Sequence, residues 1–303
     1  MNTFALNPNV YDVVFLSYDE PNADENYQHL LSIKPKAKRV HGVKGSDAAH
    51  KACAELAKTD RVIIIDGDNH VLPSLWRFNV WTRPHFDWGN HVFSWSSLNL
   101  VNHNCYGNGG VKCWPVHLLK EMRTHEVGDS VDFELDKYLE LNAIASHTVI
   151  NHSPLQAFRA GFRDGMKLLD SGNKDFDKMD WRNLYRLYNW MHVGSDIKNG
   201  IWSIYGARLG AFLLLRGHDI KVLNDFEQLD EIFNQYYGLV NSNIVEECNK
   251  LGKLLNYKLI TDILSPEESI QFKLNYKAPI RSAEEFLIGK KQEDIDRFYE
   301  RPV

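Results

Sequence analysis

Two carboxylates, Asp66 and Asp68, stand directly after an apolar run in the segment RVIIIDGDNHVL (residues 61–72). The β-branched isoleucines of this run favour a buried strand, so both acids lie at a strand end. Carboxylates one residue apart in a sharp turn can bind one hard divalent cation, and Gly67 lets a ligand approach the backbone. The pattern predicts a Mn²⁺ or Mg²⁺ site with Asp66 and Asp68 as ligands. An ordinary turn is the alternative, since Asp and Gly are common turn residues.

Strand-like and helix-like segments alternate ahead of this motif. The apolar run YDVVFLSY (11–18) favours a strand, 22–33 has helical spacing, 39–43 favours a strand and 45–60 a helix. This alternation predicts a parallel sheet, whose ligands gather at the carboxyl ends of its strands. Five polar residues are expected at those ends: Ser17, Tyr18, Asp19, Asp66 and Asp68.

The remainder of the chain changes character near residue 155. A strand is expected at 91–101, followed by a glycine-rich loop that leads into a helix within 102–122. Beyond residue 155 the apolar spacing is helical almost throughout. We therefore expect an α/β core at 1–155, with a mostly parallel sheet flanked by helices. A helical C-terminal region at 156–303 is expected to pack on it.

Composition bounds the classes of protein that fit. The chain has 303 residues and 44% hydrophobic content, enough for a large core. It contains no apolar run long enough to span a bilayer and no signal-like N-terminus, which predicts a cytoplasmic protein without membrane association. Its net charge of −5 argues against a wholly basic nucleic-acid binder. The run KPKAKRVHGVKG (34–45) nevertheless leaves a local basic face open.

The order strand, helix, strand, Ala-rich helix and then IIIDGDN resembles the metal-dependent GT-A glycosyltransferases over roughly residues 10–155. The resemblance implies a Rossmann-like, GT-A-like core and a UDP-sugar donor whose diphosphate is held by the metal. It further implies that Asp66 faces the ribose or the metal and that Asp68 is the principal metal ligand. Ser17 and Tyr18 would border the base, and Asp47 would lie near the nucleotide.

Members of that class commonly add a late His or Asp to the metal. His152, just before Pro154, is the expected third ligand, because an imidazole can join carboxylates around Mn²⁺. A histidine hydrogen-bonded near a helix start is the alternative interpretation of the same residue.

Three phrases, FLSYDEPNADENY, YGNGGVKCWP and NHSPLQAFRAGFRDG, resemble glycosyltransferases of T-even-type bacteriophages. That group includes enzymes that modify 5-hydroxymethylcytosine in phage DNA, among them an arabinosyltransferase. The resemblance implies transfer of a pentose such as arabinose, or of a hexose, to double-stranded DNA in the host cytoplasm. A glycan, lipid or protein acceptor, and a non-catalytic nucleotide- or DNA-binding protein, stay open as alternatives.

Other charged residues are candidates for proton transfer and phosphate binding. A carboxylate near the acceptor hydroxyl could act as general base, and the candidates are Asp132 and Glu134, although acids at a helix start are also normal dipole partners. Asp196 is a further catalytic candidate, in a loop that could form a second wall of the site. Lys112 could neutralise a phosphate. Arg208 lies on an otherwise apolar helical face and requires an anionic partner, such as a diphosphate, an acidic side chain or a DNA phosphate. Together the expected donor-binding residues are Ser17, Tyr18, Asp19, Asp47, Asp66, Gly67, Lys112 and Arg208.

Overall fold

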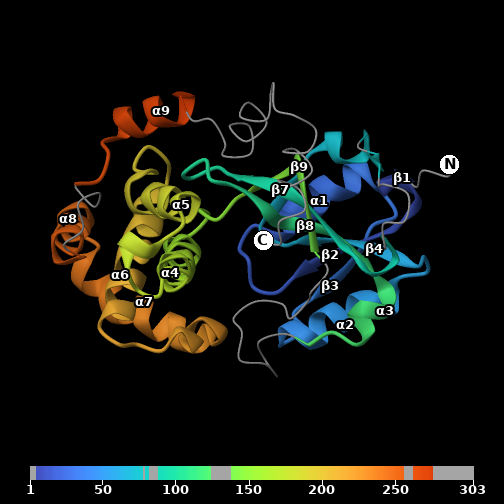
Figure 1. Cartoon of the computed structure of the whole chain (residues 1–303), viewed down its shortest axis with the longest axis horizontal. Coiled ribbons are helices and arrows are strands. Elements are labelled where there is room, and N and C mark those ends of the chain that lie inside the picture. The colour runs from blue at the N-terminus through green and yellow to red at the C-terminus, as the bar shows by residue number, and fades with distance from the viewer. Residues whose placement is uncertain (1–4, 78, 82–87, 124–137, 256–261, 276–303) are drawn as a thin grey trace.

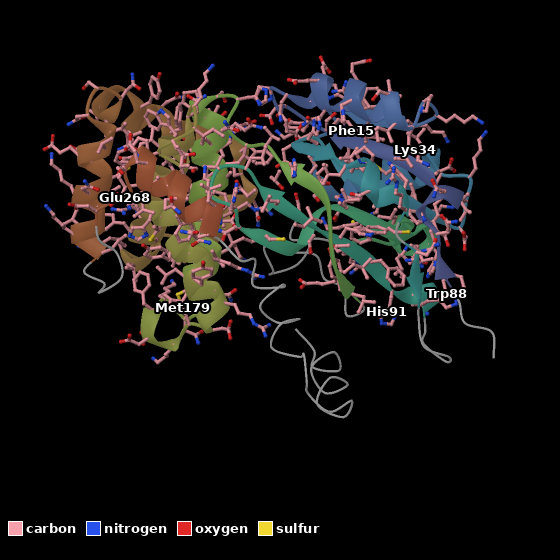
Figure 2. The ribbon with its side chains drawn as sticks, turned by 90° about the horizontal axis from the view of Figure 1, so that it is seen from above. Phe15, Lys34, Trp88, His91, Met179 and Glu268 are labelled. Atoms are coloured by element: carbon pink, nitrogen blue, oxygen red, sulfur yellow. The ribbon has the colours of Figure 1, made fainter. Side chains whose placement is uncertain are left out.

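The computed structural model of the chain describes residues 5–77, 79–81, 88–123, 138–255 and 262–275. It is an α/β structure in which a mixed, curled sheet is flanked by helices (Figure 1). A group of helices lies beside the sheet, to its left in Figure 1. Figure 2 shows Phe15 and Lys34 in the part with the sheet, whereas Met179 and Glu268 lie in the helical part.

The main sheet has seven strands in the order β3-β2-β4-β8-β7-β9-β5. Their bounds are β2 (Asp12–Ser17), β3 (Lys38–His41), β4 (Arg61–Asp66), β5 (Asn69–Val71), β7 (Val92–Asn99), β8 (Cys105–Pro115) and β9 (Tyr138–Thr148). A separate pair joins β1 (Ala5–Leu6) to β6 (Val80–Trp81). The strands expected from the first 70 residues are therefore confirmed.

The expectation of a mostly parallel sheet is wrong. Strands β2, β3 and β4 are parallel, and β9 is parallel to β7. Strand β8, however, runs antiparallel to both β4 and β7, and β5 runs antiparallel to β9. The cause for β8 is the short connection after β7, because neighbouring strands joined by a tight turn pair in opposite directions.

Strand β8 also replaces the predicted glycine-rich loop. It extends from Cys105 to Pro115 and leads directly into the short helix α3 (Val116–Lys120). Gly110 lies within it, where a side chain would overlap the carboxamide of Asn69. Gly110 is therefore needed for close packing inside a strand, not for a loop conformation.

Helices cover both faces of the sheet. Helix α1 (Ala23–Ile33) packs Leu30 in one apolar cluster with Phe15 and Ile63. Helix α2 (Ser46–Leu56) packs Cys53 against Val14 on the opposite face, in a cluster that also includes residues of α3. Since side chains alternate along a strand, the residues of β4 contribute to both clusters and the strand is buried on both sides.

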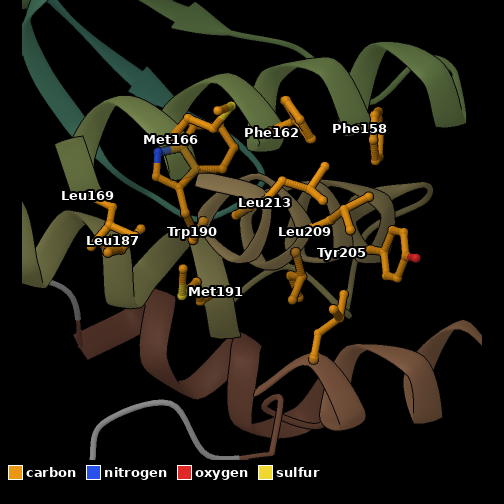
Figure 3. Packing of buried hydrophobic residues seen from close by; sticks show 14 of the residues in the cluster. Phe158, Phe162, Met166, Leu169, Leu187, Trp190, Met191, Tyr205, Leu209 and Leu213 are labelled. Atoms are coloured by element: carbon orange, nitrogen blue, oxygen red, sulfur yellow. The ribbon is translucent and has the colours of Figure 1, made fainter. Parts of the chain in front are cut away.

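The helical part comes after β9 in the chain. Its helices are α4 (Pro154–Asp170), α5 (Trp181–His192), α6 (Gly200–Leu215), α7 (Phe226–Val240), α8 (Ile244–Leu255) and α9 (Pro266–Asn275). Short 3-10 helices occupy Pro8–Val10, Pro73–Arg77, Trp88–Asn90, Phe176–Lys178 and Ile220–Asn224. Side chains of α4, α5 and α6 such as Phe162, Trp190 and Leu213 form a buried apolar cluster (Figure 3). Within the described ranges, no helix combines the length and the apolar character needed to cross a bilayer.

Candidate functional site

The candidate site lies at the carboxyl ends of the parallel strands β2, β3 and β4. Ser17 pairs in register with His41, and Leu16 pairs with Asp66, so the three strands end at the same level of the sheet. The Ser17 hydroxyl lies 3.0 Å from His41 Nδ1. The predicted meeting of Ser17 and Asp66 at one sheet edge is confirmed.

Asp66 faces a buried lysine on the antiparallel neighbour. Lys112 pairs with Ile64, two residues before Asp66 on the same face of β4, and its Nζ lies 3.7 Å from Asp66 Oδ2. Only 9% of the Lys112 side chain is exposed. Burial alone would lower the pKa of this ammonium, but the surrounding Asp66, Tyr138 and Asp68 raise it, so Lys112 stays charged. The lysine therefore offers a fixed positive charge beside the carboxylate turn.

Asp68 is positioned by its neighbour Asn69. The Asn69 Nδ2 donates to Asp68 Oδ1 at 2.6 Å, and Asn69 Oδ1 accepts from Ser146 and Ser97 hydroxyls at 2.7 and 3.1 Å. The backbone carbonyl of Asp68 accepts from Val149 N at 2.8 Å. Burial, with the charges of Asp66 and Glu20, raises the pKa of Asp68 to about 7. Asp68 is thus a carboxylate held in place and crowded by like charge.

Glu20 is a third carboxylate at this turn. Its Oε2 accepts from the Tyr18 backbone N at 2.8 Å, and burial together with Asp19 and Asp66 raises its pKa. A Cβ at Gly67 would lie 2.5 Å from Glu20 Oε2 and 2.9 Å from Ser17 Cβ. Gly67 is therefore required for close packing, as well as for the turn. The sequence pattern did not indicate Glu20, although it directly follows Asp19 after the predicted strand.

Helix α2 adds a second residue that the sequence pattern did not indicate. His50 is buried, its Nδ1 lies 2.8 Å from Ser46 O, and its ring meets Trp114 edge-on. Burial lowers the pKa of His50, and Asp66 and Lys112 both act on it electrostatically. Asp47, in the first turn of the same helix, is near enough to act on His50 as well. His50 therefore lies near the carboxylate turn, and the nucleotide contact expected of Asp47 stays a prediction.

His152 stands just before α4. Its Nε2 lies 3.4 Å from Glu25 Oε2, and its backbone N donates to Gln156 Oε1 at 3.1 Å. In the part of the chain that the structure describes, no group of three or more His, Cys, Asp or Glu side chains is arranged to hold a metal. The structure therefore gives His152 a partner on α1, and its role as third ligand stays a prediction.

The helical part reaches the same sheet edge through α4 and α7. Arg159 NH1 donates to Asp19 Oδ2 at 2.8 Å, and its Nε donates to Asp230 Oδ1 at 2.8 Å. The rings of Tyr18 and Phe226 stack with their centroids 6.3 Å apart. Asp19 thus forms an ion pair with Arg159, and the Tyr18 ring stacks on Phe226. The sequence alone did not indicate either contact.

Two expected site residues lie elsewhere. Arg208 is fully buried in the helical part, where its Nε donates to Met191 O at 2.8 Å and its NH1 to Cys248 O at 2.7 Å. Asp196 accepts from Lys273 Nζ at 2.8 and 2.9 Å, which ties α9 to the α5–α6 connection. Both groups make internal contacts, which give no support to the donor-binding role expected for Arg208 or to the catalytic role expected for Asp196, and both roles stay predictions. Asp132 and Glu134 lie outside the described residues.

No family model matches the chain, and no curated protein matches it at a significant level. The chemistry of the site is therefore inferred from its geometry alone. It combines three carboxylates, a buried lysine and a histidine at the carboxyl edge of a sheet, the position at which α/β proteins bind ligands.

Proposed function

We propose that this protein is a metal-dependent glycosyltransferase that uses a UDP-sugar. The observation that carries the proposal is the meeting of Asp66, Asp68 and Glu20 near the end of β4, where burial and, after it, the charges of Asp66 and Glu20 raise the pKa of Asp68 to about 7. Carboxylates brought together in this way are stabilised by a cation of higher charge than the single Lys112. Oxygen donors of this kind suit Mg²⁺ or Mn²⁺, which need only one or two carboxylates when substrate phosphates complete the coordination.

Each residue of the turn has its own part in this function. Asp66 and Asp68 would hold the cation, which supplies Lewis-acid neutralisation of the leaving diphosphate. Lys112 adds a fixed positive charge beside it, and Asn69 and Asn26 keep the turn in shape, the latter by donating to Gly67 O at 2.9 Å. On the nucleotide side the candidates are Ser17, Tyr18 and Asp47, and His152 is retained as a candidate ligand.

The first test is loss of metal-dependent donor binding in Asp68→Asn. Calorimetric titration of UDP with MnCl₂ should give binding for the unaltered protein and none for the variant. Glu55→Gln, which changes an exposed carboxylate on α2, is the matched control and should bind as the unaltered protein does. Equal binding by Asp68→Asn would overturn the assignment of the metal site.

The proposed acceptor is 5-hydroxymethylcytosine in double-stranded DNA, in the cytoplasm of a phage-infected cell. This choice of acceptor rests on the resemblance of three short segments to glycosyltransferases of T-even-type bacteriophages, and it needs a separate experiment. Hydroxymethylated DNA incubated with a panel of UDP-sugars and MnCl₂ should yield nucleosides heavier by a pentose or a hexose, with unmodified cytosine DNA as the control. An unchanged nucleoside mass, combined with no DNA binding at low salt, would favour a glycan, lipid or protein acceptor.

A further inference from the structure

Two exposed aromatic rings from distant parts of the chain meet at the candidate site. Tyr18 comes directly after the last residue of β2, and Phe226 is the first residue of α7. Their centroids are 6.3 Å apart and their planes differ by 24°. This separation is near the upper end of the range for aromatic pairs, so the faces cover each other only in part. Tyr18 is 36% exposed and Phe226 46%.

Ion pairs flank the two rings, and the one made by Arg159 is partly buried. Lys44, after β3, lies 3.3 Å from Glu227, the residue next to Phe226. Arg159 connects Asp19, next to Tyr18, to Asp230 on α7, and only 16% of its side chain is exposed. Its guanidinium carbon also lies 5.0 Å from the Phe226 ring centroid. A partly buried arginine shared by two carboxylates fixes geometry better than a single surface pair does.

The surroundings indicate which ligand such a pair fits. Strand β2, which ends at the aromatic pair, neighbours β4, which ends at the carboxylate turn. A ligand that spans both ends needs a planar ring at one end and phosphates at the other. A nucleoside diphosphate has this form, and aromatic side chains bind bases by stacking on their faces.

We infer that Tyr18 and Phe226 together bind the nucleobase of a nucleoside diphosphate, so that α7 of the helical part supplies one wall of the nucleotide site. The inference rests on the proposed function, because it places the phosphates at Asp66 and Asp68. The inference goes beyond the proposed function in two ways. It assigns Phe226 to base binding, and it makes the helical part necessary for donor recognition.

The test compares a ligand that has a base with one that lacks it. Calorimetric titrations of UDP and of inorganic pyrophosphate, each with MnCl₂, are performed on the full chain and on Phe226→Leu and Tyr18→Leu. Leucine keeps apolar bulk but has no flat π-face, so packing is retained and stacking is lost. Leu239→Ala, at a position on α7 that is 71% exposed, is the control for surface changes on that helix.

Both aromatic variants should bind UDP about tenfold more weakly, since the stacking of one base on an aromatic side chain contributes about that much affinity. Their affinity for pyrophosphate should equal that of the unaltered protein, and Leu239→Ala should match it for both ligands. Unchanged UDP affinity, or an equal loss for UDP and pyrophosphate, would overturn the inference alone. An unaltered protein that binds neither ligand would overturn the proposed function as well.

Discussion

At the scale of single residues, the carboxylate turn depends on Asn69. Its carboxamide is buried, donates to Asp68 and accepts from the hydroxyls of Ser97 and Ser146. Because a buried carboxamide without hydrogen-bond partners is costly, these contacts fix the orientation of Asn69 and, through it, that of Asp68. Gly110 on β8 leaves the space that the carboxamide fills.

Gly110→Ala should therefore disrupt the turn. The added methyl would overlap Asn69 Nδ2, so the carboxamide must move and its hydrogen bonds weaken. We expect a loss of about 1–3 kcal/mol in the free energy of unfolding, measured with urea. Mn²⁺-dependent UDP binding should weaken in the same variant. Alanine is intrinsically better than glycine inside a strand, so an equally stable variant would contradict the close packing.

The strand-end argument found part of the site from sequence. It placed Ser17, Asp66 and Asp68 correctly, because the carboxyl ends of neighbouring parallel strands meet whatever the connecting loops contain. It missed Glu20 and His50, since their approach to the turn depends on how a loop and a helix pack rather than on any local pattern. The separate argument from the apolar helical face did not find the hydrogen-bond partners of Arg208, because its guanidinium donates to backbone carbonyls, which have no sequence signature.

At the scale of elements, α4 and α6 pack unusually closely. Small residues repeat at four-residue spacing on both helices, and a Cβ at Gly161 would overlap the carbonyl oxygen of Ser203. Gly206 on α6 packs in the same way against the backbone at Phe158. This contact matters for the site because α4 also carries Arg159, which reaches Asp19.

Gly161→Ala should separate the two helices. The obstacle is backbone rather than a flexible side chain, so we expect a loss of about 1–3 kcal/mol in the free energy of unfolding. Gly238→Ala on α7 is the matched control, because nothing lies within 4 Å of the added methyl. That control should be neutral or more stable by up to about 1 kcal/mol. If both variants lost the same amount, helix packing would not be the cause.

Periodicity located most elements but not their pairing. The strands at β2, β3 and β4 and the helix at α2 are confirmed because each has a clear local pattern. The antiparallel direction of β8 could not be obtained in this way, since it follows from a short connection to β7 in a segment whose pattern indicated a loop rather than a strand. The glycine-rich sequence of β8 suggested a loop, because the packing of Gly110 against Asn69 leaves no mark on the local pattern.

At the scale of the whole molecule, the helical part has its own interior. His192 is fully buried at the end of α5, where its Nδ1 lies 2.8 Å from Tyr188 O. Its ring stacks on that of Tyr188 at 4.1 Å. Burial, and next the positive charge of Arg208, lower the pKa of His192 from 6.5 to about 4. Native protein therefore holds this imidazole neutral at pH values where the unfolded chain protonates it.

This shift predicts loss of stability in mild acid. Between pH 6.5 and about 4 the unfolded chain binds a proton at His192 that the folded chain does not, so the free energy of unfolding falls as pH falls. The contribution of this residue should be about 2 kcal/mol between pH 7 and pH 5. Urea unfolding across that range should show a shallower decline in His192→Asn, which keeps a donor near Nδ1 but cannot be protonated. Equal slopes for the variant and the unaltered protein would mean that His192 accepts a proton within the fold, and that the interior around Arg208 admits a second positive charge.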